Sequence, residues 1–206
     1  MSKQVVPGSN SLYVDPSGLT RCTKHALNIR PVLTQTTAKA SGTPTQTSRG
    51  LNIGYSLPIW NASDEELYWR TMIPGRWDRT TDPQFGACVS MMRVGGEDVG
   101  DKFKFQLEWQ TTTASSVMGT TTSNCVSEQT VLTGRNAQHD VYFIFFTLNA
   151  DDGTNPIVAG NMLQARLRRI AASANDCTGE IAVWDWTTIW PVDRMFTAWV
   201  NKENAA

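Results

Sequence analysis

One stretch of eight residues alternates strictly between polar and apolar side chains, and it constrains the fold more than any other feature. The stretch is 102–109, Lys-Phe-Lys-Phe-Gln-Leu-Glu-Trp. Successive side chains of a β-strand point to opposite faces of a sheet, so the apolar residues share one face. The residues of that face are Phe103, Phe105, Leu107 and Trp109. We therefore expect a strand whose aromatic face lies in a core, with Lys104 and Glu108 turned away from it.

Similar runs, separated by turn residues such as Pro74-Gly75 and Asp152-Gly153, predict more strands. The expected strands are 51–57, 66–73, 85–94, 128–133, 141–148, 162–170 and 180–190, with a shorter ninth at 195–200. A competing helix at 159–174 lacks a stripe with a 3.6-residue period. About eight strands without internal repeats indicate an antiparallel sandwich or barrel. We predict an all-β fold, an antiparallel two-sheet jelly-roll-like sandwich with an extended N-terminal arm.

The first fifty residues have a different character from the rest. The tract 34–49 holds almost nothing that could enter a core, and two short apolar pieces, 12–14 and 26–33, precede it. We predict an extended arm at 1–50, with one or two edge strands, and a sandwich domain at 51–206. The residues expected to anchor the arm on a partner are Leu12, Tyr13, Leu27 and Ile29.

Charge and hydropathy narrow the functional classes. The net charge is −1 and only 18% of residues are charged, which does not favour binding to nucleic acid or to an anionic membrane. The N-terminal residues contain no apolar segment typical of a secretory signal, and the longest apolar run, 141–146, is far too short to cross a membrane. We expect a soluble protein made in a cytoplasm.

Catalytic and metal-binding patterns are weak. The four cysteines are far apart and form no CxxC pair, so we expect small buried side chains, with a disulfide left open as an alternative. His25 and His139 belong to no catalytic motif, and the oxygen-rich segment 149–155 fits an Asp-Gly turn better than a calcium loop. We predict no enzyme activity, no cofactor and no metal site.

Tryptophan is abundant, with eight residues, and four of them lie in the last quarter of the chain. Simple alternation places Trp184 and Trp186 on one face of a strand. Such residues could form a core, a subunit interface or a platform for sugar rings, and all three remain open. The candidates for an interface are Trp184, Trp186, Trp190 and Trp199.

The order of several segments resembles that of small structural proteins of tailed bacteriophages. A strand ending in Pro74 is followed by Arg76-Trp77-Asp78 and by Thr81-Asp82-Pro83, and Gly100-Asp101 opens the next strand. Later come Gly160-Asn161 before a strand with Arg166 and Arg168, and Asp176-Cys-Thr-Gly179-Glu180 before the last strand. The resemblance covers about 63–190. Asn161 stands where the family usually has an acid, and Arg76 and Arg79 flank the Trp-Asp pair.

The resemblance implies a jelly-roll component of the virion, typically trimeric, that often serves as capsid cement or decoration. On this hypothesis the partners are further copies of the chain and the major capsid protein or another virion protein, and the location is the virion. The alternative is a carbohydrate- or receptor-binding jelly roll of a phage tail or neck, using Trp184 and Trp186. An enzyme such as a polysaccharide hydrolase is the third and least favoured class.

Overall fold

The alternating stretch forms most of β10 (Lys102–Thr112) in a computed structural model of the chain. The structure describes residues 44–58, 65–75, 77, 79, 81–113 and 116–192, and also five short strands that precede them. For those five strands, β1–β5, and for Val192 it describes the backbone alone.

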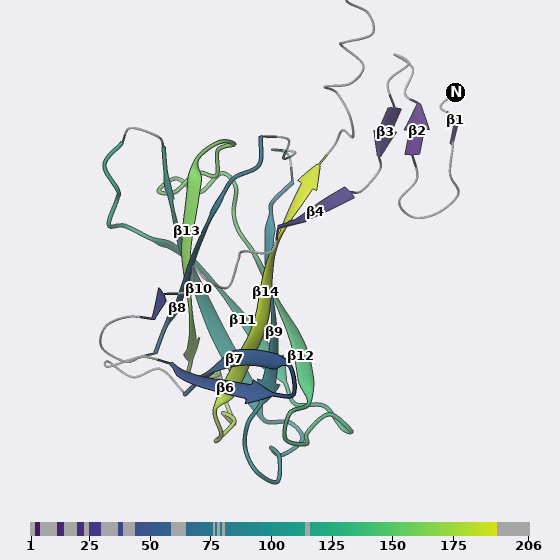
Figure 1. Cartoon of the computed structure of the whole chain (residues 1–206), viewed down its shortest axis with the longest axis vertical. Helices are drawn as coiled ribbons and strands as arrows, with labels where there is room; N and C mark the ends of the chain where they lie inside the picture. Colours follow the sequence, from purple (N-terminus) through teal and green to yellow (C-terminus); the bar gives the residue numbers. More distant parts are fainter. Residues whose placement is uncertain are drawn as a thin grey trace, which may run out of the picture.

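Two antiparallel sheets make up the sandwich (Figure 1). The first sheet has the order β11 (Ser123–Thr130), β10, β13 (Met162–Ile170), β8 (Leu67–Met72) and β5 (Thr37–Ala38). The second has the order β12 (Val141–Thr147), β9 (Gln84–Met91), β14 (Ile181–Val192), β7 (Asn52–Leu57) and β6 (Thr45–Arg49). A further strand, β4 (His25–Ile29), pairs with the end of β14.

The strand order is that of a jelly roll. Among the eight strands β7–β14, consecutive strands lie in opposite sheets except for the pair β10 and β11, which form a hairpin. The resulting orders, 7-14-9-12 and 8-13-10-11, interleave early and late strands, as two Greek keys do. The predicted all-β, two-sheet jelly-roll-like fold is confirmed.

The core lies between the two sheets and is rich in aromatic side chains. Phe103, Phe105, Leu107 and Trp109 all face it and are buried, as the alternation predicts. The rings of Trp69 on β8 and Phe85 on β9 stack with centroids 4.2 Å apart, and Trp186 on β14 lies 6.3 Å from Trp69. These contacts join the first sheet directly to the second.

Two strands differ from the prediction. β11 covers Ser123–Thr130 instead of 128–133, because its stability comes from eight paired positions along β10 and not from an apolar face of its own. β6 takes residues 45–49, which the sequence assigned to the arm, into a hairpin with β7. The expected strand at 195–200 lies outside the described residues.

The segments before residue 44 also contain strands. β1 (Lys3–Gln4), β2 (Leu12–Val14) and β3 (Thr20–Cys22) form a small antiparallel sheet, which Figure 1 shows outside both sheets of the sandwich. β4 pairs with β14 of the second large sheet, and β5 pairs with β8 of the first. In the part of the chain that the structure describes, no helix has the length and apolar character to cross a membrane.

Truncating Phe105 to alanine should lower the free energy of unfolding by about 3–5 kcal/mol, because a fully buried phenyl ring leaves a cavity between the sheets. Lys104→Ala, on the opposite face of the same strand, is the matched control and should change it by less than about 1 kcal/mol. Urea titration followed by tryptophan fluorescence measures both. Equal losses in the two variants would contradict the assigned facing of β10.

Candidate functional site

A β-bulge in β14 (Ile181–Val192) places Trp184 and Trp186 on opposite faces of the sheet, although simple alternation predicts that they share one face. The pairing of β14 with β9 shifts between Val183 and Asp185, which adds one residue to β14. Trp184 therefore lies on the outer face, where its indole N–H donates to the Ser90 hydroxyl at 2.7 Å and its ring covers Gly54. Trp186 faces the core. The predicted shared face of Trp184 and Trp186 is wrong.

The remaining interface candidates are either buried in the core or lie where the structure describes no side chain. Trp190 is fully buried and makes a T-shaped contact with Trp77, with ring centroids 5.8 Å apart. Trp186 and Trp190 are therefore core residues, corrected from interface candidates, because inward-facing positions of β14 hold them between the sheets. Trp199 lies outside the described residues. Leu12 and Tyr13 fall in β2, and Leu27 and Ile29 fall in β4, where only the backbone is described.

The outer face of β12 carries a row of exposed apolar side chains. We call Val141, Phe143 and Phe145 the β12 row. Phe143 is 65% exposed and Phe145 is 51% exposed, although the Phe145 ring lies over Gly86 of β9. β12 is an edge strand, and its sequence, Val-Tyr-Phe-Ile-Phe-Phe-Thr, contains no charge, proline or glycine. The strand expected at 141–148 is confirmed, but its exposed row was not predicted, because apolar residues on both faces conceal the alternation.

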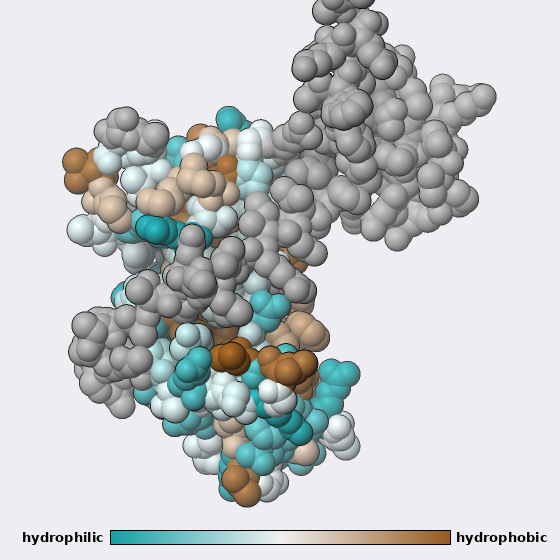
Figure 2. Space-filling view, in the orientation of Figure 1, coloured by the Kyte–Doolittle hydropathy of each residue, from teal (hydrophilic) through white to brown (hydrophobic). Residues whose placement is uncertain are grey.

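Elsewhere on the surface, exposed apolar residues are dispersed. Figure 2 shows one face of the molecule as mainly hydrophilic, with hydrophobic residues in small patches, one of them over β6 and β7. Leu51, in the turn between these strands, is fully exposed, and Ile53 on β7 is about half exposed. Isolated residues of this kind are common on protein surfaces and indicate no binding site.

The outer face of the first sheet carries a network of ion pairs. Glu108 on β10 is paired with Arg166 and Arg168 of β13, the latter at 2.7 Å, and both arginines also reach Glu66. Glu108 is only 6% exposed. It faces away from the core as predicted, but the two guanidinium groups cover it. Each charge in the network is compensated, which makes its burial tolerable.

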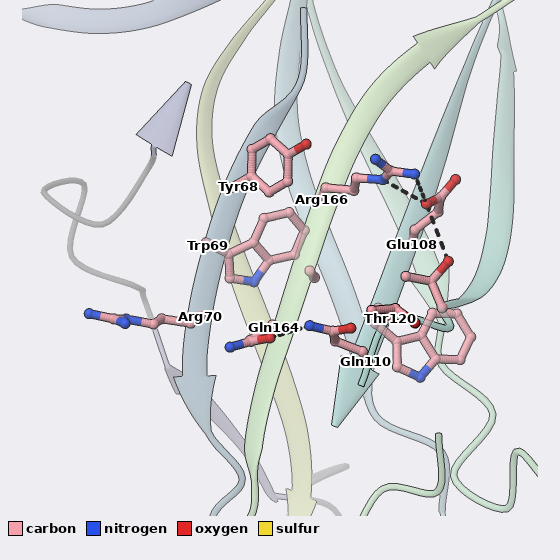
Figure 3. Close-up of a pocket in the computed structure, with 11 residues that line it drawn as sticks. Tyr68, Trp69, Arg70, Glu108, Gln110, Thr120, Gln164 and Arg166 are labelled. Carbon is pink, nitrogen blue, oxygen red and sulfur yellow. Dashed lines mark hydrogen bonds and ion pairs between the residues drawn. The ribbon is translucent and has the colours of Figure 1, made fainter. Parts of the chain in front are cut away.

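Beside this network lies a hollow of about 660 Å³, which we call the sheet hollow. The side chains that line it from the outer face are Tyr68, Arg70, Glu108, Gln110, Gln164 and Arg166. Figure 3 shows them on the three neighbouring strands β8, β13 and β10. Thr120 and Thr122 line it from the segment before β11, and the Thr122 hydroxyl is 3.4 Å from a carboxylate oxygen of Glu108.

The polar side chains that line the sheet hollow mostly have hydrogen-bond or ion-pair partners, and Trp69, Trp109 and Ala165 add apolar surface. Gln110 donates to Gln164 across the strands, and the Tyr68 hydroxyl donates to Glu66. Burial raises the pKa of Tyr68, and its hydrogen bond to Glu66 raises it further, so the phenol stays protonated at neutral pH. This site was not predicted from the sequence, because its residues come from three strands and only the alternation of β10 and β13 indicated which residues face outward.

Metal-binding side chains do not cluster in the described part of the chain. No cluster of three or more His, Cys, Asp or Glu occurs there that could hold a metal ion. Asp152, in the oxygen-rich segment, accepts hydrogen bonds from the Ser123 hydroxyl and from the backbone N–H groups of Thr154 and Asn155. Its carboxylate closes a turn.

The structure describes the side chains of three of the four cysteines, and all three are free thiols. Cys177 is buried, as expected, whereas Cys88 and Cys125 are half-buried. Burial raises the pKa of both Cys125 and Cys177 to about 12, and it raises that of Cys88 as well. Since the thiolate is the nucleophile, these residues are poorly suited to covalent catalysis at neutral pH.

Comparisons with known proteins give distant structural similarities. No protein-family model matches the chain, and no curated protein matches its sequence. A solved xylan-binding module, CBM15, is similar with a TM-score of 0.44 at 11% identity, covering 81% of this chain and 97% of that one. A TNF protein, Eiger from S. frugiperda, is similar with a TM-score of 0.32 at 9% identity, covering 85% and 96% respectively.

We expect iodoacetamide at pH 8 to alkylate Cys125 and Cys177 at least about 100-fold more slowly in the folded chain than in urea, because a pKa near 12 leaves little thiolate. Mass spectrometry of tryptic peptides measures each site separately. Rapid alkylation of either residue in the folded chain would reveal an activated thiol and would support the enzyme hypothesis.

Proposed function

We propose that the chain is a non-enzymatic structural protein of a phage virion, a cement or decoration protein that associates with itself and binds neighbouring capsid subunits. The order of its sequence segments supports a relation to such proteins, and a jelly-roll sandwich is suited to broad protein contacts. The proposal contains two surfaces. Copies of the chain meet at the β12 row. The N-terminal strands β1–β3 attach the assembly to the capsid.

The β12 row is the observation that carries this proposal. An uncharged edge strand with exposed aromatic residues promotes association between chains unless something covers it. β12 pairs with β9 on one side and lacks the lysine, proline or bulge that usually protects such an edge. The row offers no charge for recognition by a charged partner, and uncharged aromatic contacts are typical of interfaces between identical subunits. We therefore assign it to a second copy of the chain within a closed homo-oligomer.

The carbohydrate-binding alternative depended on a pair of exposed tryptophans. Only Trp184 of that pair lies on the surface, and its ring covers Gly54 while its N–H is bonded to Ser90. A sugar platform made of Trp184 and Trp186 is therefore not available. We do not propose that function for these residues.

Replacing Phe143 and Phe145 together by serine should convert the oligomer into monomers, because the two largest exposed side chains of the β12 row would be lost. Light scattering at micromolar concentration measures the mass. Val126→Ser, at an exposed apolar position of β11, is the control and should leave the oligomer intact. A monomeric wild-type protein, or an oligomer unaffected by the double substitution, would contradict the assigned interface.

Deleting residues 1–24 should leave the sandwich folded but lower its occupancy on capsids, because the deletion removes β1–β3 and keeps the strands that pair with the two large sheets. Thermal unfolding of the truncated chain tests the first part. Cryo-electron microscopy of particles bearing truncated or full-length chains tests the second. Unchanged occupancy would show that β1–β3 are not the attachment element.

A further inference from the structure

The outer face of the first sheet presents two parallel rows of polar side chains across the same three strands (Figure 3). One row is formed by Tyr68, Arg166 and Glu108, which lie opposite one another in the strand register. The next row is formed by Arg70, Gln164 and Gln110 in the same way. The sheet hollow lies over both rows. Because the residues come from paired strands, their spacing is fixed by the sheet and not by a loop.

The second row has unused hydrogen-bonding capacity. Gln110 donates to the side-chain oxygen of Gln164, which leaves the Gln110 oxygen as an acceptor and one N–H of Gln164 for a further partner. The Gln164 amide nitrogen otherwise makes only a weak contact with the Met162 sulfur at 3.9 Å. A neighbouring donor and acceptor on a rigid surface match hydroxyl groups, since a hydroxyl both donates and accepts.

Charge restricts the ligand further. The positive charge of Arg166 is compensated by Glu66 and Glu108. Arg70, by contrast, is exposed and makes no ion pair or hydrogen bond within the described residues. A single free guanidinium is too little for a ligand that carries several phosphates, but it can hold one carboxylate in bidentate geometry. Trp69, Trp109 and Ala165 also line the sheet hollow, so its lining combines polar and apolar groups, as a sugar ring with its hydroxyl groups does. A volume of about 660 Å³ falls within the usual range for small-molecule and sugar sites.

We propose that the sheet hollow binds a saccharide that carries a carboxylate, such as a uronic-acid unit of an acidic polysaccharide. The amides of Gln110 and Gln164 bind sugar hydroxyls, and the Tyr68 hydroxyl accepts a hydrogen bond from another. The Arg70 guanidinium binds the carboxylate. The site uses neither the β12 row nor β1–β3, so it lies apart from the surfaces that we assign to assembly.

Isothermal titration of the full-length chain with two soluble ligands tests this proposal. The ligands are a hexamer of galacturonic acid and, as the neutral counterpart, the same hexamer with its carboxylates reduced to hydroxymethyl groups. We expect the acidic oligomer to bind more tightly. Gln110→Ala combined with Gln164→Ala should weaken its binding by about tenfold or more, as expected for the loss of hydrogen bonds to hydroxyl groups.

Arg70→Ala changes an exposed side chain and should remove the preference for the acidic oligomer while leaving the affinity for the neutral oligomer unaffected. Arg135→Ala, which removes an equal charge from an exposed loop outside the sheet hollow, is the control and should change neither affinity. The proposal is overturned by an absence of binding at millimolar concentration, by equal affinity for both oligomers, or by an equal effect of Arg135→Ala and Arg70→Ala.

Discussion

Burial of one aromatic layer between two sheets is the constraint on which the rest of the structure depends. Trp69 of β8 stacks on Phe85 of β9, and Trp186 of β14 packs beside Trp69, so strands far apart in sequence meet at one place. Each sheet must turn one face toward this layer, which leaves the other face for different chemistry. The two outer faces are therefore the surfaces that can acquire a function without disturbing the core.

Those two faces have acquired opposite characters. On the first sheet, Glu66 and Glu108 together neutralise Arg166 and Arg168 of β13, so this ion-paired patch is polar and structured but carries no net charge. On the second sheet, the β12 row leaves aromatic rings in contact with solvent. Burying an ion-paired surface in a protein contact is costly, whereas burying exposed aromatic rings is favourable. The difference explains why we assign subunit contacts to one face and ligand binding to the other.

The sequence was sufficient for the parts of the fold that depend on local alternation. The facing of β10 and the extent of β13 agree with prediction, because each has one polar and one apolar face. The bounds of β11 were predicted wrongly, because they are set by its pairing with β10. The facing of Trp184 and Trp186 was predicted wrongly, because a bulge in β14 places them on opposite faces. The sheet hollow could not be predicted, because Glu108 and Arg166 are 58 residues apart and meet only through strand register.

The position of β4 has a mechanical consequence. β4 pairs with β14, and β14 also pairs with β9 and β7, which makes it the middle strand of its sheet. A pulling force applied to β1–β3 thus enters the sandwich through β4, at residues 188–192 of β14, of which Thr188 and Ile189 also pair with β9. Peeling β14 away would require breaking hydrogen bonds to β9 and withdrawing Trp186 and Trp190 from the core. Such a force is resisted first by the pairing of β4 with β14, a strand inside its sheet, and it does not act directly on the edge strand β12.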